Sequence, residues 1–228
     1  MEQTDTGLLR GQRPEETYVA FIDILGFSRK VKEEYDNIIE AYENILTDAQ
    51  LLPVMVPGIQ LRIFSDSLMV TAKDLLSIIT SVNALHQVTL FHDCLIRGGI
   101  AYGKHVEVAE SGNLYLVSQS LIKAIEIEKS INNPCVVLHP DIIIPREWWP
   151  PVPNPFLRKL MYYEGNTIVS PFNIMWGLSA MTRVSMMLER YPDHHDKYNW
   201  FLKLYKAVWS AIPLVPPEIA KYYRRGEF

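Results

Sequence analysis

The sequence predicts an α+β fold, in which a ferredoxin-like palm sheet carries helices on one face and is followed by a helical C-terminal extension. One observation is the order of the patterns: strand, helix, hairpin, helix, strand, helix and strand. A second is the absence of the regular βαβ alternation that a Rossmann fold requires. The length of 228 residues and the 48% hydrophobic content suit one core. We therefore expect a tail at 1–17, a main domain at 18–170 and the extension, packed on the same domain, at 171–228.

The first strand and helix carry the clearest patterns. Tyr18–Ile24 is a short apolar run with β-branched and aromatic residues, which is typical of a buried central strand. Ser28 then has the side chain of a helix N-cap. From Val31 to Leu52, apolar residues recur at helical spacing between charged and polar ones, so we expect an amphipathic helix there.

A hairpin and a second helix follow. Residues 59–72 indicate two strands joined by a tight turn at Ser65–Ser67, after a stretch with two prolines and a glycine. Asp74 can cap the next helix, which we expect to run to about Phe91. The hairpin therefore carries an acidic residue, Asp66, at its tip.

The remaining elements complete the predicted sheet. Residues 94–108 indicate a strand that forms a hairpin, and its three glycines suggest a close backbone approach. We expect a helix at 117–130, a strand at 134–142 and a further strand or hairpin at 161–171. Two or three helices beyond Phe172 form the extension.

Composition excludes several classes of protein. The formal net charge of −4, without long basic runs, argues against a nucleic-acid-binding surface. Cys94 and Cys135 lack the spacing of a zinc or redox site and indicate two free thiols. No segment has the roughly 20 uninterrupted apolar residues of a membrane span. We expect a cytoplasmic protein that binds neither membrane nor nucleic acid.

Two carboxylates are placed to meet at one edge of this sheet. In a ferredoxin-like order the first strand lies beside the hairpin, so Asp23 and Asp66 come together next to Gly26. They would repel each other unless a divalent cation lies between them, and Mg²⁺ and Mn²⁺ prefer such oxygen ligands. The alternative is that Asp23 caps the turn and Asp66 is an ordinary turn residue.

Four motifs in chain order resemble those of the class III nucleotidyl cyclases. Among these proteins the sequence is most similar to the pyrimidine cyclases of bacterial Pycsar anti-phage systems. The resemblance spans Tyr18 to Lys129, and its last motif places Ala124 and Glu128 on a helix. The motifs are FIDILGFS, RIFSDSLMV, RGGIAYG and LIKAIEIEK.

The resemblance implies an enzyme that converts a nucleoside triphosphate to a 3′,5′-cyclic monophosphate and pyrophosphate. It implies a homodimer with active sites at the subunit interface, and a separate effector protein that reads the cyclic product. Carried over by motif position, Asp23, Asp66 and the backbone carbonyl of Ile24 would hold two Mn²⁺ or Mg²⁺ ions. The two acids would then serve catalysis as well as metal binding.

Substrate contacts follow from the same motifs. The backbone amides of the turn at Gly26, Phe27 and Ser28 would cradle the triphosphate, although a strand-to-helix turn needs such a glycine anyway. Arg62 matches the position of a base-reading side chain, and its other interpretation is an exposed strand arginine. Tyr115 matches a second base-contact position.

Arg62 also indicates which base is read. A guanidinium only donates hydrogen bonds, so it suits acceptors such as the O2 and O4 oxygens of uracil. We therefore expect UTP as substrate and cyclic UMP as product. CTP, cyclised to cyclic CMP, is the second candidate.

One departure from the family pattern leaves activity open. Ile122 and Glu126 stand where adenylyl and guanylyl cyclases carry an asparagine and an arginine that act on the transition state. Lys123 is a candidate substitute, or a solvated helix lysine. The chain is then either a cyclase of another branch or an inactive domain that binds nucleotide or a partner protein.

Two other features are interpreted as structural. Arg97 is interpreted as a brace of the sheet. The stretch PDHHD at 192–196 is interpreted as a polar turn between helices.

Overall fold

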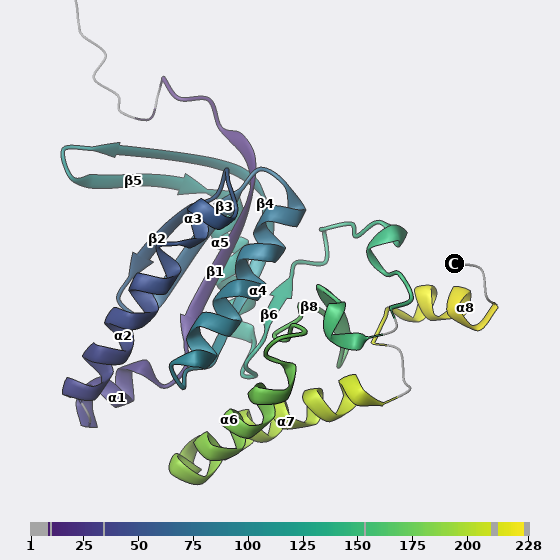
Figure 1. Cartoon of the computed structure of the whole chain (residues 1–228). Coiled ribbons are helices and arrows are strands. Elements are labelled where there is room, and N and C mark those ends of the chain that lie inside the picture. The colour runs from purple at the N-terminus through teal and green to yellow at the C-terminus, as the bar shows by residue number, and fades with distance from the viewer. Residues whose placement is uncertain (1–8, 10, 34, 153, 211–213, 226–228) are drawn as a thin grey trace, which may run out of the picture.

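The chain folds around one large mixed sheet (Figure 1). A computed structural model describes residues 9, 11–33, 35–152, 154–210 and 214–225, so residues 1–8 and 10 of the predicted tail lie outside it. Strand β1 begins at Glu15, inside that tail. The strands of the described part are β1 Glu15–Ile24, β2 Gln60–Phe64, β3 Ser67–Ala72, β4 Ile96–Glu110, β5 Asn113–Ser118, β6 Val136–Leu138, β7 Leu160–Tyr163 and β8 Asn166–Val169.

Helices surround the sheet and form the C-terminal part of the chain (Figure 1). The α-helices are α1 Phe27–Glu33, α2 Tyr35–Ala49, α3 Leu52–Met55, α4 Leu75–Phe91, α5 Gln119–Ser130, α6 Gly177–Arg190, α7 His195–Trp209 and α8 Pro217–Arg225. Short 3-10 helices lie at η1 Arg146–Trp148, η2 Pro155–Leu157 and η3 Pro192–His194. Among the described residues, no helix combines the length and the apolar character needed to cross a membrane.

The strand order confirms the predicted α+β palm fold. β1 pairs antiparallel with β3 on one side and with β4 on the other, and β2 pairs antiparallel with β3. The resulting order β2-β3-β1-β4, with helices between β1 and β2 and between β3 and β4, is that of a ferredoxin-like sheet. β6 then adds parallel to β4, and the predicted hairpin at 161–171 is present as β7 and β8.

The two faces of the sheet have different roles. Ile22 pairs with Leu68, and Ile24 pairs with Ile96; these side chains belong to the core shared with α2 and α4. On the opposite face, α5 packs so closely on β4 that a Cβ on Gly99 would collide with the backbone of the helix. A glycine there admits the helix. Beyond α5, towards β2, this face is more open; we call it the open face.

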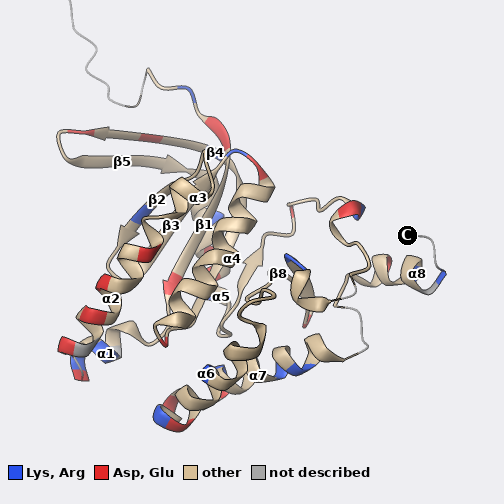
Figure 2. Cartoon of the chain, in the orientation of Figure 1, with Lys and Arg blue, Asp and Glu red and all other residues tan. Residues whose placement is uncertain are grey.

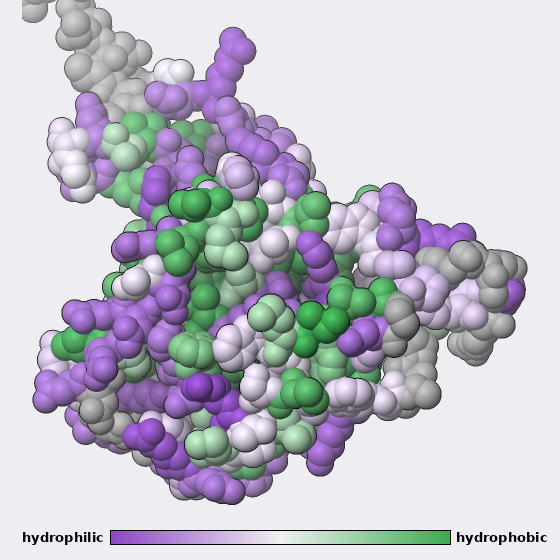
Figure 3. Space-filling view, viewed as in Figure 1, coloured by the Kyte–Doolittle hydropathy of each residue, from purple (hydrophilic) through white to green (hydrophobic). Residues whose placement is uncertain are grey.

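The C-terminal helices form a second apolar cluster at one end of the sheet. Tyr198 and Phe201 of α7 pack with Val184 of α6, and Leu25, directly after β1, packs against the same cluster. The neighbouring helices α6 and α7 and the short α8 lie in the green-to-yellow part of Figure 1. In that view hydrophilic residues dominate the surface around α1 and α2, and apolar residues gather nearer its centre (Figure 3).

Three local expectations need correction. Ser28 lies inside α1, which begins at Phe27, so it is not the N-cap. The helix predicted from residue 117 begins at Gln119, because Ser118 ends β5 and caps the helix by accepting a hydrogen bond from the Leu121 amide at 3.0 Å. The helix predicted over 31–52 is divided among α1, α2 and α3. Asp74 caps α4 as predicted.

Candidate active site

Asp23 lies near the end of the central strand β1, on the open face. It is paired with Ser67 of β3 and with Arg97 of β4. Because side chains alternate along a strand, Asp23 points away from the core that holds Ile22 and Ile24. Its side chain is 21% exposed, and its Oδ2 accepts a hydrogen bond from Arg97 Nε at 3.3 Å. The carboxylate is therefore half-buried beside one cation.

The turn between β2 and β3 brings Asp66 to the same end of the sheet. Ser65 takes a positive φ of 54°, and the Tyr42 hydroxyl donates to its carbonyl oxygen. The Ile24 amide donates to the Asp66 carbonyl oxygen at 2.9 Å, which ties the end of β1 to the turn. The Ser28 hydroxyl donates to Asp66 Oδ2 at 3.3 Å. Asp23, Ile24 and Asp66 are thus neighbours, as the sequence predicted.

The electrostatics of this end favour an added cation. Burial raises the pKa of Asp23; Arg97 lowers it in part, and Asp66 and Glu128 raise it further. The charged form of Asp23 is therefore destabilised, which a divalent cation would relieve. Within the described ranges, no group of three or more His, Cys, Asp or Glu is placed to bind a metal ion. Two carboxylates fit Mg²⁺ or Mn²⁺ when phosphate oxygens complete the coordination.

Arg97 ties three elements together beside the two acids. Its Nη2 lies 2.8 Å from Glu128 Oε1, and its Nη1 donates to the Ile131 carbonyl oxygen at 3.1 Å. With Asp23 as third partner, it joins β4 to β1 and to the end of α5. Glu128 is buried, so this arginine balances its charge. The geometry agrees with the bracing role that the sequence favoured.

The glycine turn after β1 has a conformation that needs glycine. Gly26 has a φ of 79°, and α1 starts at the next residue. The Phe27 ring packs on the Tyr42 ring with centroids 5.0 Å apart. Phe27 therefore braces α1 against α2, and any contact it makes with a phosphate would come from its backbone.

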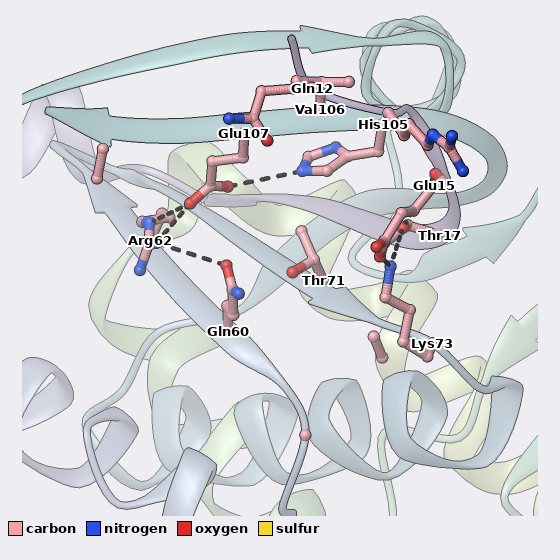
Figure 4. A pocket seen from close by; sticks show the side chains of 14 residues that line it. Gln12, Glu15, Thr17, Gln60, Arg62, Thr71, Lys73, His105, Val106 and Glu107 are labelled. Carbon is pink, nitrogen blue, oxygen red and sulfur yellow. Dashed lines mark hydrogen bonds and ion pairs between the residues drawn. The ribbon is translucent and has the colours of Figure 1, made fainter. Parts of the chain in front are cut away.

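Arg62 lies on the open face, further along the sheet from the acids. It pairs with Met69 of β3, two residues from Ser67, so it is on the same face as Asp23. A cavity of about 330 Å³ opens beside it (Figure 4). Arg62 Nε donates to Glu107 Oε1 at 2.9 Å, and Gln60 Oε1 lies 3.5 Å from Nη2.

Glu107 and His105 are pocket residues that the sequence interpretation missed. Their side chains are 9% and 8% exposed, and Glu107 Oε2 lies 3.6 Å from His105 Nε2 (Figure 4). In the described part of the chain, Glu107 Oε2 and His105 Nδ1 have no hydrogen-bond partner. Buried polar atoms of this kind suit a polar ligand. The signal in the sequence was alternation: the two residues stand two apart on β4 and share one face.

Lys123 and Tyr115 lie away from the acids of their own chain. Lys123 Nζ lies 2.8 Å from Asp141 Oδ2, in the segment after β6. Tyr115 is on β5, opposite Val108. The β4–β5 hairpin projects from the end of the sheet opposite α1 (Figure 1), and Tyr115 does not line the cavity at Arg62.

The segment 192–196 does form the connection between two helices, as predicted, but it is also close to the acids. It consists of η3 and the first residues of α7. A Cβ added to Gly26 would lie 3.0 Å from His194 Nε2. The pattern PDHHD gave no indication of this contact, because it depends on the packing of α6 and α7.

Comparisons with known proteins return structural likenesses at low identity. No protein-family model matches the chain, and a search of curated proteins gives no match. The adenylyl cyclase CyaB from P. aeruginosa is similar at 14% identity, with a TM-score of 0.46, over 57% of this chain and 79% of that one.

Two fungal structures give similar values. The guanylyl cyclase domain of the RhoGC fusion protein from Blastocladiella emersonii is 14% identical, with a TM-score of 0.48, over 56% of this chain and 81% of that one. The guanylate cyclase domain of RhGC from Catenaria anguillulae, in complex with GTP, is 12% identical with a TM-score of 0.48, over 56% and 80%. The three similar structures are nucleotidyl cyclases, with TM-scores below 0.5. The palm fold of this chain is established by its own strand order.

Proposed function

We propose that this chain is a nucleotidyl cyclase that converts UTP to 3′,5′-cyclic UMP and pyrophosphate. One observation carries the proposal: Asp23 and Asp66 meet at one end of the open face, and Arg62 with its cavity lies further along the same face. A nucleoside triphosphate can span the two, with its phosphates at the acids and its base at Arg62. The four cyclase-like motifs support the same assignment.

The chemistry requires little covalent participation from the protein. The ribose 3′-oxygen forms a bond to the α-phosphorus, the bond from that phosphorus to the bridging oxygen of the β-phosphate breaks so that pyrophosphate leaves, and the hydroxyl proton passes to solvent water. Asp23, Asp66 and the Ile24 carbonyl would hold divalent ions, Mn²⁺ or Mg²⁺, which supply charge neutralisation and activation of the hydroxyl. The turn at Gly26, Phe27 and Ser28 would position the phosphates.

The choice of pyrimidine rests on the Arg62 cavity. Arg62 donates and the Glu107 carboxylate accepts, so together they complement a base edge with both kinds of group. Uracil presents two carbonyl oxygens on either side of its N3–H, which suits this pair. Cytosine presents O2 and N3 beside an amine, so CTP is the second candidate. A volume of about 330 Å³ suits a small ligand.

A homodimer is part of the proposal. Several apolar side chains are exposed on the β4–β5 hairpin and the adjoining start of α5, where water would otherwise cover them. They are Tyr115 at 37% and Val117 at 62%, which share one face of β5, and Ile122 at 60% on α5. A partner subunit packed against this end of the chain would cover such side chains, and its Lys123 and Tyr115 would then be available to the site described here.

The biological role follows the same resemblance. We propose that the chain acts in the cytoplasm in anti-phage defence, where a separate effector protein reads the cyclic nucleotide. The competing function is an inactive domain that binds nucleotide or a partner. The exposed Ile122 and Glu126 favour that alternative, because neither can donate the hydrogen bonds that the corresponding asparagine and arginine supply in adenylyl and guanylyl cyclases.

The test is to identify products. Purified protein is incubated with ATP, GTP, CTP or UTP plus Mn²⁺, and the products are analysed by mass spectrometry. Cyclic UMP as main product, with cyclic CMP second, supports the proposal. A cyclic purine nucleotide as main product would overturn the base assignment. Absence of any cyclic product, with nucleotide binding retained, would favour the inactive domain.

A further inference from the structure

The C-terminal helices reach the phosphate end of the candidate site. The α6–η3–α7 unit, residues 177–209, folds back so that His194 touches the Gly26 turn. Leu25, between Asp23 and that turn, packs into the same apolar cluster as Tyr198 of α7. The unit therefore lies directly beside the residues that carry the proposed metal and phosphate contacts.

A set of polar contacts fixes this position. Lys30 of α1 donates from Nζ to the Asp93 carbonyl oxygen at 3.2 Å, and the same Nζ lies 4.8 Å from the centre of the Tyr191 ring, between α6 and η3. Arg183 of α6 pairs with Asp93 at 2.7 Å. Contacts from both α1 and the end of α4 thus hold the unit against the end of the sheet.

His194 is the N-cap of α7, and Lys197 lies three residues later in the first turn of that helix, so Lys197 is at the helix end that lies beside the Gly26 turn. Its side chain is half-buried, and in the described part of the chain it has no hydrogen bond or ion pair, unlike Lys123 with Asp141. Burial lowers the pKa of Lys197; Arg97 lowers it further, whereas Asp23 raises it. The position of Lys197 itself follows from the packing: the end of α7 that carries it lies against the Gly26 turn.

We propose that Lys197 is a phosphate-binding residue, supplied by the C-terminal unit of the same chain to the end of the site that holds Asp23 and the Gly26 turn. The inference rests on the proposed function, because it takes a triphosphate as ligand. A lysine ammonium binds phosphate oxygens as a compact charge with three donors. Ile122 and Glu126 have no donor for a phosphate, so the chain would need positive charge from another element, and Lys197 would supply it.

Lys197 is one of several basic residues on the C-terminal unit. Lys and Arg recur along α6 and α7 (Figure 2). Lys203 is on the same helix as Lys197 but is exposed. It offers a matched control, since the same substitution there changes the charge of α7 without touching the site.

The experiment measures binding of inorganic tripolyphosphate with Mn²⁺ by calorimetry, on the full chain. We expect Lys197→Met to weaken binding roughly tenfold to a hundredfold, as for loss of a charged hydrogen bond. Lys197→Arg should keep most of the affinity, and Lys203→Met should bind like the wild type. Lys197→Gln, which keeps a polar side chain, serves as second variant if Lys197→Met has a lowered Tm.

The outcomes separate this inference from the proposed function. Wild-type affinity in both Lys197→Met and Lys197→Gln would overturn the role of Lys197. Weakened binding in both, with full affinity in Lys203→Met, supports it. If the wild type forms no cyclic nucleotide but Lys197 variants still lose tripolyphosphate, the cyclase proposal fails and the phosphate site stands.

Discussion

The two ends of the open face differ in how their charges are balanced. At the Arg62 end, the guanidinium and the Glu107 carboxylate pair directly with Nε–Oε1 at 2.9 Å, so the charges of these two residues balance each other. At the Asp23 end, Arg97 pairs with both Asp23 and the buried Glu128, Asp66 lies next to Asp23, and the pKa of Asp23 is raised by burial despite the arginine. The first end offers a paired donor and acceptor to a polar ligand, and the second favours an added positive charge.

This difference indicates where each part of the proposed nucleotide substrate would bind. A base is uncharged and is selected by the positions of its donors and acceptors, which a preformed Arg–Glu pair can match. A triphosphate brings divalent cations, which relieve the repulsion between Asp23 and Asp66. The comparison therefore orients the proposed substrate, and variants at each end should have distinct effects.

The largest effect is expected from Asp66→Ala. The turn is held by backbone contacts to Ile24 and by the Tyr42 hydroxyl, so the variant should fold. Turnover should fall on the order of a hundredfold to a thousandfold, because the charge that holds the cations is lost. Asp36→Ala, at an exposed acid of α2, is the control and should keep wild-type turnover. Full turnover by Asp66→Ala would refute the proposed role of the acid end.

Mixing two variants tests whether a partner chain completes the acid end of the site. We expect Asp66→Ala and Lys123→Glu each to be inactive alone, and their mixture to recover about a quarter of wild-type activity, because half of the dimers then hold one intact site. Heterodimers are verified by differential tags and mass spectrometry. Verified heterodimers without recovered activity would indicate that the site lies within one chain, and an active Lys123→Glu homodimer would remove Lys123 from catalysis.

At the other end, Arg62→Ala should alter the choice of base rather than abolish the reaction. We expect UTP turnover, measured as kcat/KM, to fall roughly tenfold to a hundredfold through loss of a charged hydrogen bond. CTP turnover should fall by a different factor, so the ratio of the two is the measurement. Arg225→Ala, at an exposed arginine of α8, is the control. An unchanged UTP to CTP ratio in Arg62→Ala would exclude Arg62 from base reading.

The smallest effect concerns stability and pH in the absence of metal ions. A carboxyl group with a raised pKa binds a proton more tightly in the folded state, so the free energy of unfolding falls as pH rises through the window between its ordinary and raised pKa. Asp23→Asn removes this loss. Its Tm in EDTA should therefore gain on the wild type as pH rises from about 4 towards neutral.

Asp74→Asn is the control, because its Tm relative to the wild type should change with pH in the opposite direction. The Ser77 amide, which donates to Asp74, lowers the pKa of that acid, so its charge stabilises the fold above its ordinary pKa and this contribution is lost as pH falls. Asp74→Asn should lose Tm relative to the wild type at neutral pH and approach it in acid. Parallel pH profiles for the two variants would show that the two acids do not differ as described.

The sequence predicted the palm sheet because its evidence is local and repeated. Strand and helix periods, the turn at Ser65–Ser67 and the Asp74 cap each depend on a few neighbouring residues. The approach of Asp23 to Asp66 followed once the strand order was assumed. These expectations were confirmed by the pairing of β1 with β3.

What the sequence could not predict depends on distant packing. The Arg62–Glu107 pair joins β2 to β4, and the His194 contact joins the C-terminal helices to Gly26. Neither contact can be predicted from the spacing of the residues in the sequence, because each depends on strand register or on how the helices pack. The start of α1 also differs from the expected one. The helix begins at Phe27, directly after the Gly26 turn, and not after an N-cap at Ser28.

The central claim is that the acid end binds divalent cations together with a triphosphate. Its most direct test is a Mn²⁺ titration followed by electron paramagnetic resonance, with the non-cyclisable 3′-deoxy-UTP or with uridine present. The account predicts tight Mn²⁺ binding with the triphosphate, weak binding with uridine, and loss of the tight binding in Asp66→Ala. Equal Mn²⁺ binding by wild type and Asp66→Ala in the presence of 3′-deoxy-UTP would contradict it.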